Sequence, residues 1–218
     1  MLMALALLAL VVQETLFSTR TRIEMDFLSL ISAVSVGIGL SAACGFRIFL
    51  PPAMMSLAAN LDWMELDGQF AMLDSWGAFA VLSAAVAFEI GGYFIPWIDN
   101  LLDIVATPAA ALAGVFVSAS MLGDFDPMLQ WAVALIAGGG AAGTVQIGTV
   151  ATRAASTGAT GGLANPLIAI FEAIAAVVLT ILALLSPIIV VIVLIAVFYF
   201  LFKMIGNLKQ KKAQTQTV

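Results

Sequence analysis

Four charged residues lie within or beside the long apolar segments of this sequence: Arg47, Glu89, Arg153 and Glu172. A charged side chain at the depth of a bilayer costs at least about 2.5–3.5 kcal/mol on insertion scales, so such groups are usually paired or face a cavity. Two interpretations of the glutamates stay open. They bind a coupling ion or a proton, or they form structural ion pairs with the two arginines. Both can hold in different states of one cycle.

Two aspartates follow the first glutamate. Asp99 and Asp103 are four residues apart, so they share one face of a helix. Their carboxylates suit a cation that prefers hard oxygen ligands. The alternative is that they mark the membrane interface beside Trp97.

A polar stretch, RAASTGATGGLANP, opens at Arg153 and supplies Ser156, Thr157 and Asn165 just before an apolar segment. Backbone N–H groups and the helix dipole favour an anion at a helix N-terminus. The stretch therefore predicts a small anion site, with a flexible turn as the alternative. It lacks the glycine-lysine pattern of a nucleotide-binding loop, which argues against ATP.

The composition identifies the solvent of these residues. The chain is 63% hydrophobic and 10% charged, whereas soluble domains are about one quarter charged. It is therefore expected to be an integral membrane protein whose main partner is the lipid bilayer. Histidine is absent and Cys44 is the single cysteine, so we expect no metal site and no cofactor. The sequence has no basic patch for nucleic acid and no nucleophile beside a base, so we do not expect an enzyme.

Six apolar segments approach the length of about 20 residues that a helix needs to cross a bilayer. They cover residues 27–50, 76–98, 106–123, 128–151, 163–185 and 187–206. Four polar-proline dipeptides predict helix starts, with an in-helix proline as the alternative. They are Thr107-Pro108, Asp126-Pro127, Asn165-Pro166 and Ser186-Pro187. The predicted fold class is all-α, a polytopic membrane bundle of six transmembrane helices.

The order of the charged residues predicts a 3+3 inverted repeat, with halves at 25–125 and 126–206. In each half an arginine is followed by a span that contains a glutamate, and then by a span without an acidic residue. Three helices per half reverse the direction of the second half, as in many transporters. This pattern places Arg47 near the outer end of its span, Arg153 near the inner end of its own, and both glutamates near the midplane.

The ends of the chain set its expected orientation. Residues 1–24 are an N-terminal extension, interpreted as a peripheral helix or an upstream start, with a seventh span as the alternative. Residues 207–218 form a tail. Lysine and arginine gather beside the first and last spans, which predicts that both ends of the six-helix core are cytoplasmic. These basic residues are Arg20, Arg22, Lys203, Lys209, Lys211 and Lys212.

Small residues at four-residue spacing predict close helix packing. The pairs are Gly37 with Ser41, Gly39 with Ala43, Gly138 with Ala142, and Gly139 with Gly143. The three consecutive glycines at 138–140 either serve packing or mark an unwound stretch that forms a site.

Several motifs together resemble one family. GLSAACGFRIFLPP, FEIGGYFIPWIDNLLDIVATPAAALAG, IAGGGAAG and RAASTGATGGLANP are similar to an uncharacterised bacterial integral-membrane family, catalogued only as a domain of unknown function. The resemblance covers roughly residues 27–190 and implies the bacterial cytoplasmic (inner) membrane. The resembling proteins usually begin near the position of Met25, which favours an upstream start for residues 1–24. The family implies no activity.

These observations favour a small transporter or channel for a small ion or polar solute. The alternative is a non-catalytic accessory or assembly subunit of a membrane complex. A membrane-embedded enzyme acting on lipid is the least supported. At 22.7 kDa the chain is small for a transporter, so we expect a homo-oligomer.

Overall fold

The computed structural model describes residues 26–66, 68–196 and 199, apart from the side chains at 96, 97, 99 and 100. Every regular element in this part of the chain is a helix, so the predicted all-helical class is confirmed. The predicted extension 1–24, the tail 207–218 and most of the last predicted span beyond residue 196 lie outside the described residues.

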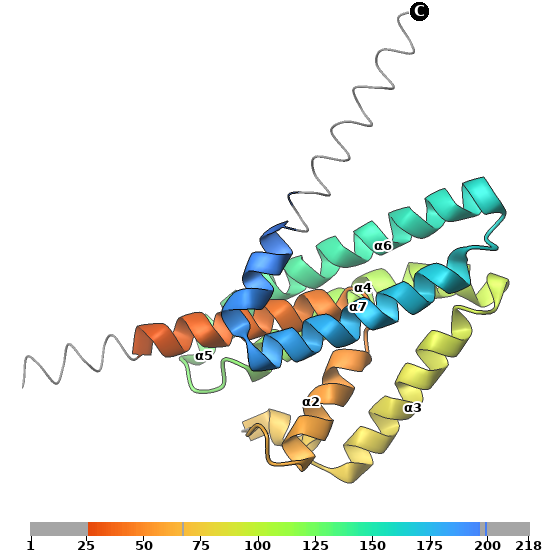
Figure 1. Cartoon of the computed structure of the whole chain (residues 1–218). Coiled ribbons are helices and arrows are strands. Elements are labelled where there is room, and N and C mark those ends of the chain that lie inside the picture. The colour runs from red at the N-terminus through yellow and green to blue at the C-terminus, as the bar shows by residue number, and fades with distance from the viewer. Residues whose placement is uncertain (1–25, 67, 197–198, 200–218) are drawn as a thin grey trace, which may run out of the picture.

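Figure 1 shows the arrangement of the helices. The helices Asp26–Cys44 and Pro187–Ala196 are named here by their bounds. The others are α2 (Leu50–Asn60), η1 (Gly68–Leu73), α3 (Trp76–Gly92), α4 (Pro96–Ser120), α5 (Pro127–Val133), η2 (Ala134–Gly138), α6 (Gly139–Thr160) and α7 (Asn165–Leu185). α4 packs against η2 and α6, and α2 packs against α3.

Within the part of the chain that the structure describes, four helices are long and apolar enough to cross a membrane: Asp26–Cys44, Leu101–Ser120, Pro127–Thr160 and Asn165–Leu185. Trp76–Gly92 and Pro187–Ala196 are apolar and shorter. Large apolar side chains on the outer faces of these helices are exposed, among them Phe88, Ile104 and Leu185. Such a surface suits hydrocarbon rather than water. The chain is thus a membrane-like helical protein.

The first predicted span, 27–50, is wrong as a single helix. The helix ends at Cys44, residues 45–49 are not helical, and α2 begins at Leu50. Pro51 and Pro52 have no N–H to donate to the carbonyls four residues earlier, so a helix cannot continue through this stretch. Both prolines fall in the first turn of α2, where no such bond is required.

Asp126-Pro127 starts a helix as predicted. Asp126 is the N-cap of α5, and its Oδ1 accepts the N–H groups of Met128 at 2.9 Å and Leu129 at 3.3 Å. Ser186-Pro187 also acts as predicted, because α7 ends at Leu185 and the next helix begins at Pro187.

Removing this cap gives a prediction about stability. Asp126→Ala is expected to lower the free energy of unfolding by about 1 kcal/mol, because two N–H groups of α5 lose their acceptor. Asp126→Asn, whose amide oxygen can still accept, should keep most of that energy. Thermal unfolding of the purified variants in detergent measures both. Equal losses for alanine and asparagine would contradict a role as N-cap.

Of the other two proline dipeptides, Asn165-Pro166 starts a helix as predicted and Thr107-Pro108 does not. Pro108 lies inside α4, which begins at Pro96, so the predicted start of a span at residue 106 is wrong. The Thr107 hydroxyl donates to the Asp103 carbonyl within the helix at 3.3 Å, so it is not a cap. Asn165 is the first residue of α7 rather than its cap.

The three glycines at 138–140 lie in continuous helix. Gly138 ends the π-helical turn η2 and Gly139 begins α6, so the chain is not unwound there. A methyl group added at Gly138 would lie 2.6 Å from the Cβ of Ser118 on α4. Of the two predicted alternatives for this glycine, packing is therefore the one that the structure supports.

Candidate buried charge cluster

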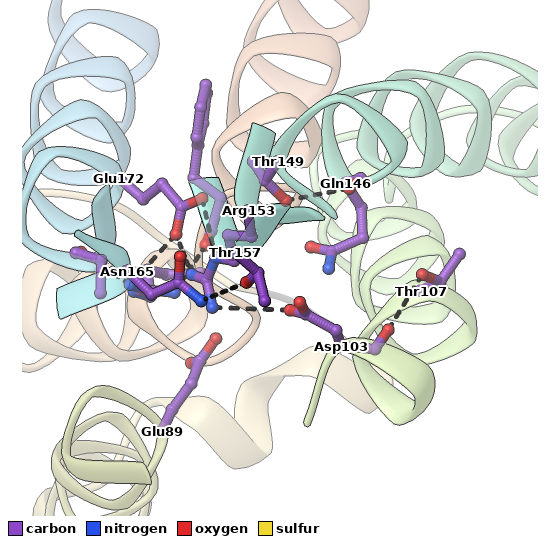
Figure 2. Close-up of polar contacts among 12 residues, drawn as sticks. Glu89, Asp103, Thr107, Gln146, Thr149, Arg153, Thr157, Asn165 and Glu172 are labelled. Atoms are coloured by element: carbon purple, nitrogen blue, oxygen red, sulfur yellow. Dashed lines mark hydrogen bonds and ion pairs between the residues drawn. The ribbon is translucent and has the colours of Figure 1, made fainter. Parts of the chain in front are cut away.

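Three of the four predicted charged residues meet inside the protein, and Figure 2 shows two of them, Arg153 and Glu172, in contact. Arg47 comes from the break after the first helix, Arg153 from the last two turns of α6, and Glu172 from the N-terminal half of α7. Arg47 and Arg153 are 1% and 2% exposed, and Glu172 is 5% exposed. Three segments that are distant in sequence thus place their charged side chains in contact inside the protein.

Glu172 is shared by both arginines. The Nε of Arg153 donates to Glu172 Oε1 at 3.2 Å, and its Nη2 donates to Oε2. The Nη2 of Arg47 lies 3.3 Å from the same Oε2. Because both guanidinium groups reach one carboxylate oxygen, they lie at one depth in the protein. The prediction that Arg47 and Arg153 occupy opposite ends of their spans is therefore wrong.

Arg47 also holds the helix break in place. Its Nη2 donates to the carbonyl of Ala169 in α7 at 2.6 Å, and its Nη1 donates to the Phe46 carbonyl at 3.2 Å. The side chain thus ties residues 45–49 to α7. An arginine is tolerated in the apolar stretch AACGFRIFLPP because another helix supplies both a counter-charge and a hydrogen-bond acceptor.

Two further residues complete the cluster. The carboxylate of Asp103 on α4 lies 3.5 Å from Nη1 of Arg153. The ring of Tyr93, which follows α3, has its centroid 3.5 Å from the Cζ of Arg153 and 4.6 Å from that of Arg47. An aromatic face stabilises a desolvated guanidinium. The sequence indicated Asp103 as a cation ligand or an interface marker, not as a partner of Arg153. Tyr93 was missed, although a tyrosine four residues after a buried glutamate was a usable signal.

Glu89 is bound differently from Glu172. Its carboxylate accepts the N–H of Ile48 at 2.8 Å and the N–H of Phe49 at 3.2 Å. Among the described residues no ion pair joins it to an arginine. Of the two interpretations left open for Glu89, the ion pair with an arginine does not hold here, because Arg47 turns to α7 while Glu89 accepts the two N–H groups just before α2.

A cavity of about 320 Å³ lies beside Glu89. Ile48 and Phe49 of the break line it, together with the last turns of α3 and one face of α4 between Leu102 and Ala109. We call this cavity the Glu89 pocket. Glu89 and Tyr93 are its polar lining residues, and the rest of its lining is aliphatic or phenylalanine. The pocket thus combines one acidic side chain with a lining that is mostly apolar.

The predicted anion loop is held by its own side chains. The side-chain amide of Asn165 donates to the hydroxyl of Thr157 at 3.1 Å, which joins the end of α6 to the start of α7. Ser156 is half-buried one turn beyond Arg153. Arg153 ties this stretch to the charge cluster, and the loop stays a prediction as an anion site. The side chain of Asp99 lies outside the described residues.

Two buried polar residues of α6 were missed. Gln146 and Thr149 share a face with Arg153, because the three positions are spaced by three and four residues. Figure 2 places both on the helical turns that precede Arg153. Polar residues at this spacing on an apolar helix were a signal for an inward polar face. In the described part of the chain, no three acidic or cysteine side chains gather as metal ligands.

The chain matches one family of proteins over most of its length. Residues 34–207 match the family described as "Domain of unknown function (DUF4126)". Neither the curated proteins nor the solved structures include a match to this chain. The family match agrees with the resemblance seen in the sequence motifs. The protein belongs to the DUF4126 family, whose function is unknown.

Proposed function

We propose that the protein is a small integral membrane transporter or channel for a small ion or polar solute, and that Glu89 is its exchangeable site. The observation that carries this proposal is the contrast between the two buried glutamates. Glu172 is occupied by two arginines, whereas Glu89 has two backbone N–H donors and a cavity beside it. In this proposal Glu172 stabilises the fold, and Glu89 binds and releases the transported proton or cation.

The balance of charge in the cluster supports this assignment. Three carboxylates, those of Glu89, Asp103 and Glu172, accompany the guanidinium groups of Arg47 and Arg153. Counted over the described side chains alone, these five groups carry one excess negative charge when all are ionised. An uncompensated charge is costly in a low-dielectric interior. A proton or a bound cation at Glu89 would remove this excess, and its release and rebinding would be the elementary step of transport.

The proposal includes the finer topology. We infer six membrane-spanning segments with the α3 and α7 helices as the glutamate-bearing members of a 3+3 inverted repeat. α3 has 17 residues, and a helix of this length spans about 25 Å, slightly less than the hydrocarbon core. We place the protein in the bacterial inner membrane as a homo-oligomer, with both ends of the core cytoplasmic.

Solid-supported-membrane electrophysiology on reconstituted protein tests the proposal. Proton, sodium, potassium and small-anion gradients would be applied in turn. We expect a wild-type current with at least one gradient and a loss of about tenfold or more for Glu89→Gln, since the exchangeable charge is gone. Glu65→Gln is the matched control, because Glu65 is exposed in the connection after α2, and its current should equal that of the wild type.

The currents must be compared between folded proteins. Cys44 is the single cysteine and is fully buried, so its reaction with a thiol-reactive fluorophore reports unfolding. A folded Glu89→Gln protein with a wild-type current would contradict the role given to Glu89. No current from the wild type with any gradient would favour the second candidate function.

That second candidate is an accessory or assembly subunit. The observation in its favour is an outward row of small residues on α6 at four-residue spacing: Gly140, Thr144, Gly148 and Thr152. A Cβ added at Gly140 or Gly148 would meet no atom of the described residues within 4 Å. Such a row lets another helix approach closely. Co-purification of a distinct membrane protein, lost on Gly148→Leu, would support this function.

A further inference from the structure

We propose that the Glu89 pocket binds hydrophobic organic cations, molecules with one delocalised or quaternary positive charge and an apolar body. The inference rests on the proposed function, because it names the class of solute that the exchangeable glutamate would carry. The observation behind it is the combination of one carboxylate with an otherwise apolar lining. Such a lining is complementary to one charge on an apolar molecule.

The size and access of the pocket suit such a molecule. Its volume of about 320 Å³ is within the range that holds small organic ligands. α3 and α4 diverge from the turn at 93–95 (Figure 1), and the pocket lies between them. Phe88 and Val105, which line it, are 82% and 56% exposed on the outer surface of the helices. A hydrophobic solute can therefore enter from the hydrocarbon side.

The charges of the lining select a cation. Glu89 is the acidic lining residue, and neither Arg47 nor Arg153 is among the residues that line the pocket. A carboxylate offers about four acceptor positions, and the N–H groups of Ile48 and Phe49 occupy two of them. Glu89 thus retains acceptor capacity for a positive ligand, while it repels an anion.

The aromatic residues add to this preference. Phe49 and Phe88 line the pocket. Tyr93 also lines it, but its ring already faces the guanidinium groups of Arg153 and Arg47. The negative face of an aromatic ring attracts a desolvated cation. A small inorganic cation would find only one carboxylate and would lack the six or more oxygen ligands that such ions as Ca²⁺ prefer. An organic cation satisfies both the charge and the apolar surface.

The test is equilibrium binding of tetraphenylphosphonium to purified full-length protein, with tetraphenylborate as a probe of nearly the same shape and opposite charge. We expect saturable binding of the cation to the wild type and no comparable binding of the anion. Glu89→Gln should weaken cation binding by about tenfold or more. Glu65→Gln should leave it unchanged.

A second variant avoids the risk that Glu89→Gln disturbs the start of α2. Ala109→Phe keeps Glu89 and fills part of the lining from α4, where Ala109 is half-buried. It should also weaken binding of tetraphenylphosphonium by about tenfold or more, because the pocket volume is reduced. Wild-type binding to both folded variants would overturn the proposal.

Other outcomes also decide the question. Equal binding of tetraphenylborate would indicate an apolar groove for lipid chains and would overturn the proposal. Failure of the cation to bind the wild type would overturn it too. If a proton current depends on Glu89 but no organic cation binds, the proposed transport function is supported and hydrophobic organic cations are excluded as its solute. If the cation binds at Glu89 but no gradient gives a current, the inference stands as a binding site and the transport function falls.

Discussion

Glu172→Gln is expected to lower the midpoint of thermal unfolding by roughly 6 to 20 °C. The substitution removes the carboxylate charge that both Arg47 and Arg153 contact and leaves two guanidinium groups in a site where they are 1% and 2% exposed. Breaking a buried ion pair by removing one partner costs about 3–5 kcal/mol, and each kcal/mol shifts the midpoint by about 2–4 °C in a chain of this size.

The loss should be larger than that of Glu89→Gln or Glu65→Gln. Glu89→Gln removes a charge that accepts two backbone N–H groups, and the amide oxygen can still accept one of them. Glu65→Gln changes an exposed side chain and should shift the midpoint by less than about 1 °C, since surface changes are worth little. The expected order of destabilisation is therefore Glu172, then Glu89, then Glu65.

Exposure of Cys44 measures this series. The thiol is fully buried beside the helix break, so a thiol-reactive fluorophore reacts only as the protein opens. If the Glu172→Gln and Glu65→Gln midpoints were the same, the shared carboxylate would contribute little to stability. In that case other groups would balance the charges of Arg47 and Arg153, and the structural role proposed for Glu172 would be wrong.

The sequence largely predicted which residues form the buried charge cluster. It did not predict which carboxylate each arginine contacts. Arg47, Arg153 and Glu172 stand out in the sequence because charge is rare in apolar segments of this length. Which carboxylate each arginine meets depends on how the break after Cys44 packs on α7. That packing joins residues 122 positions apart in the sequence, and no local spacing contains it. The order of residues in the predicted repeat therefore does not contain the contact of Arg47 with Glu172.

Local chemistry predicted helix ends where a side chain could act alone. Asp126 caps α5 with its own carboxylate, as expected of that residue before a proline. A continuous apolar run conceals the break at 45–49, although Pro51 and Pro52 lie just beyond it. Pro108 misleads in the opposite sense, because α4 already starts at Pro96 and continues through it. Hydrophobic runs thus indicate where helical segments lie. Whether a nearby proline starts, ends or lies within a helix depends on its position relative to the other helix signals.

Two neighbouring glycines are expected to respond to alanine with opposite signs. Gly138 and Gly114 form a helix crossing, in which an added Cβ at Gly138 would lie 2.7 Å from the Gly114 carbonyl oxygen and 2.6 Å from Ser118 Cβ. Gly140 belongs to the same glycine run, but its added Cβ would meet no described atom within 4 Å. One methyl group therefore enters a packed contact at Gly138 and an open face at Gly140.

Gly138→Ala should lower the free energy of unfolding by about 1–3 kcal/mol, because α4 and η2 must separate to admit the methyl group. Gly140→Ala should raise it by about 0.5–1 kcal/mol, because alanine loses less conformational entropy than glycine in a helix. Gly114→Ala should resemble Gly138→Ala, since its added Cβ would lie 2.5 Å from Ala142 Cβ. The Cys44 unfolding assay compares all three. Stabilisation by Gly138→Ala would contradict the close crossing of α4 with η2. A lower midpoint for Gly140→Ala alone would show that another helix covers the outward face of Gly140.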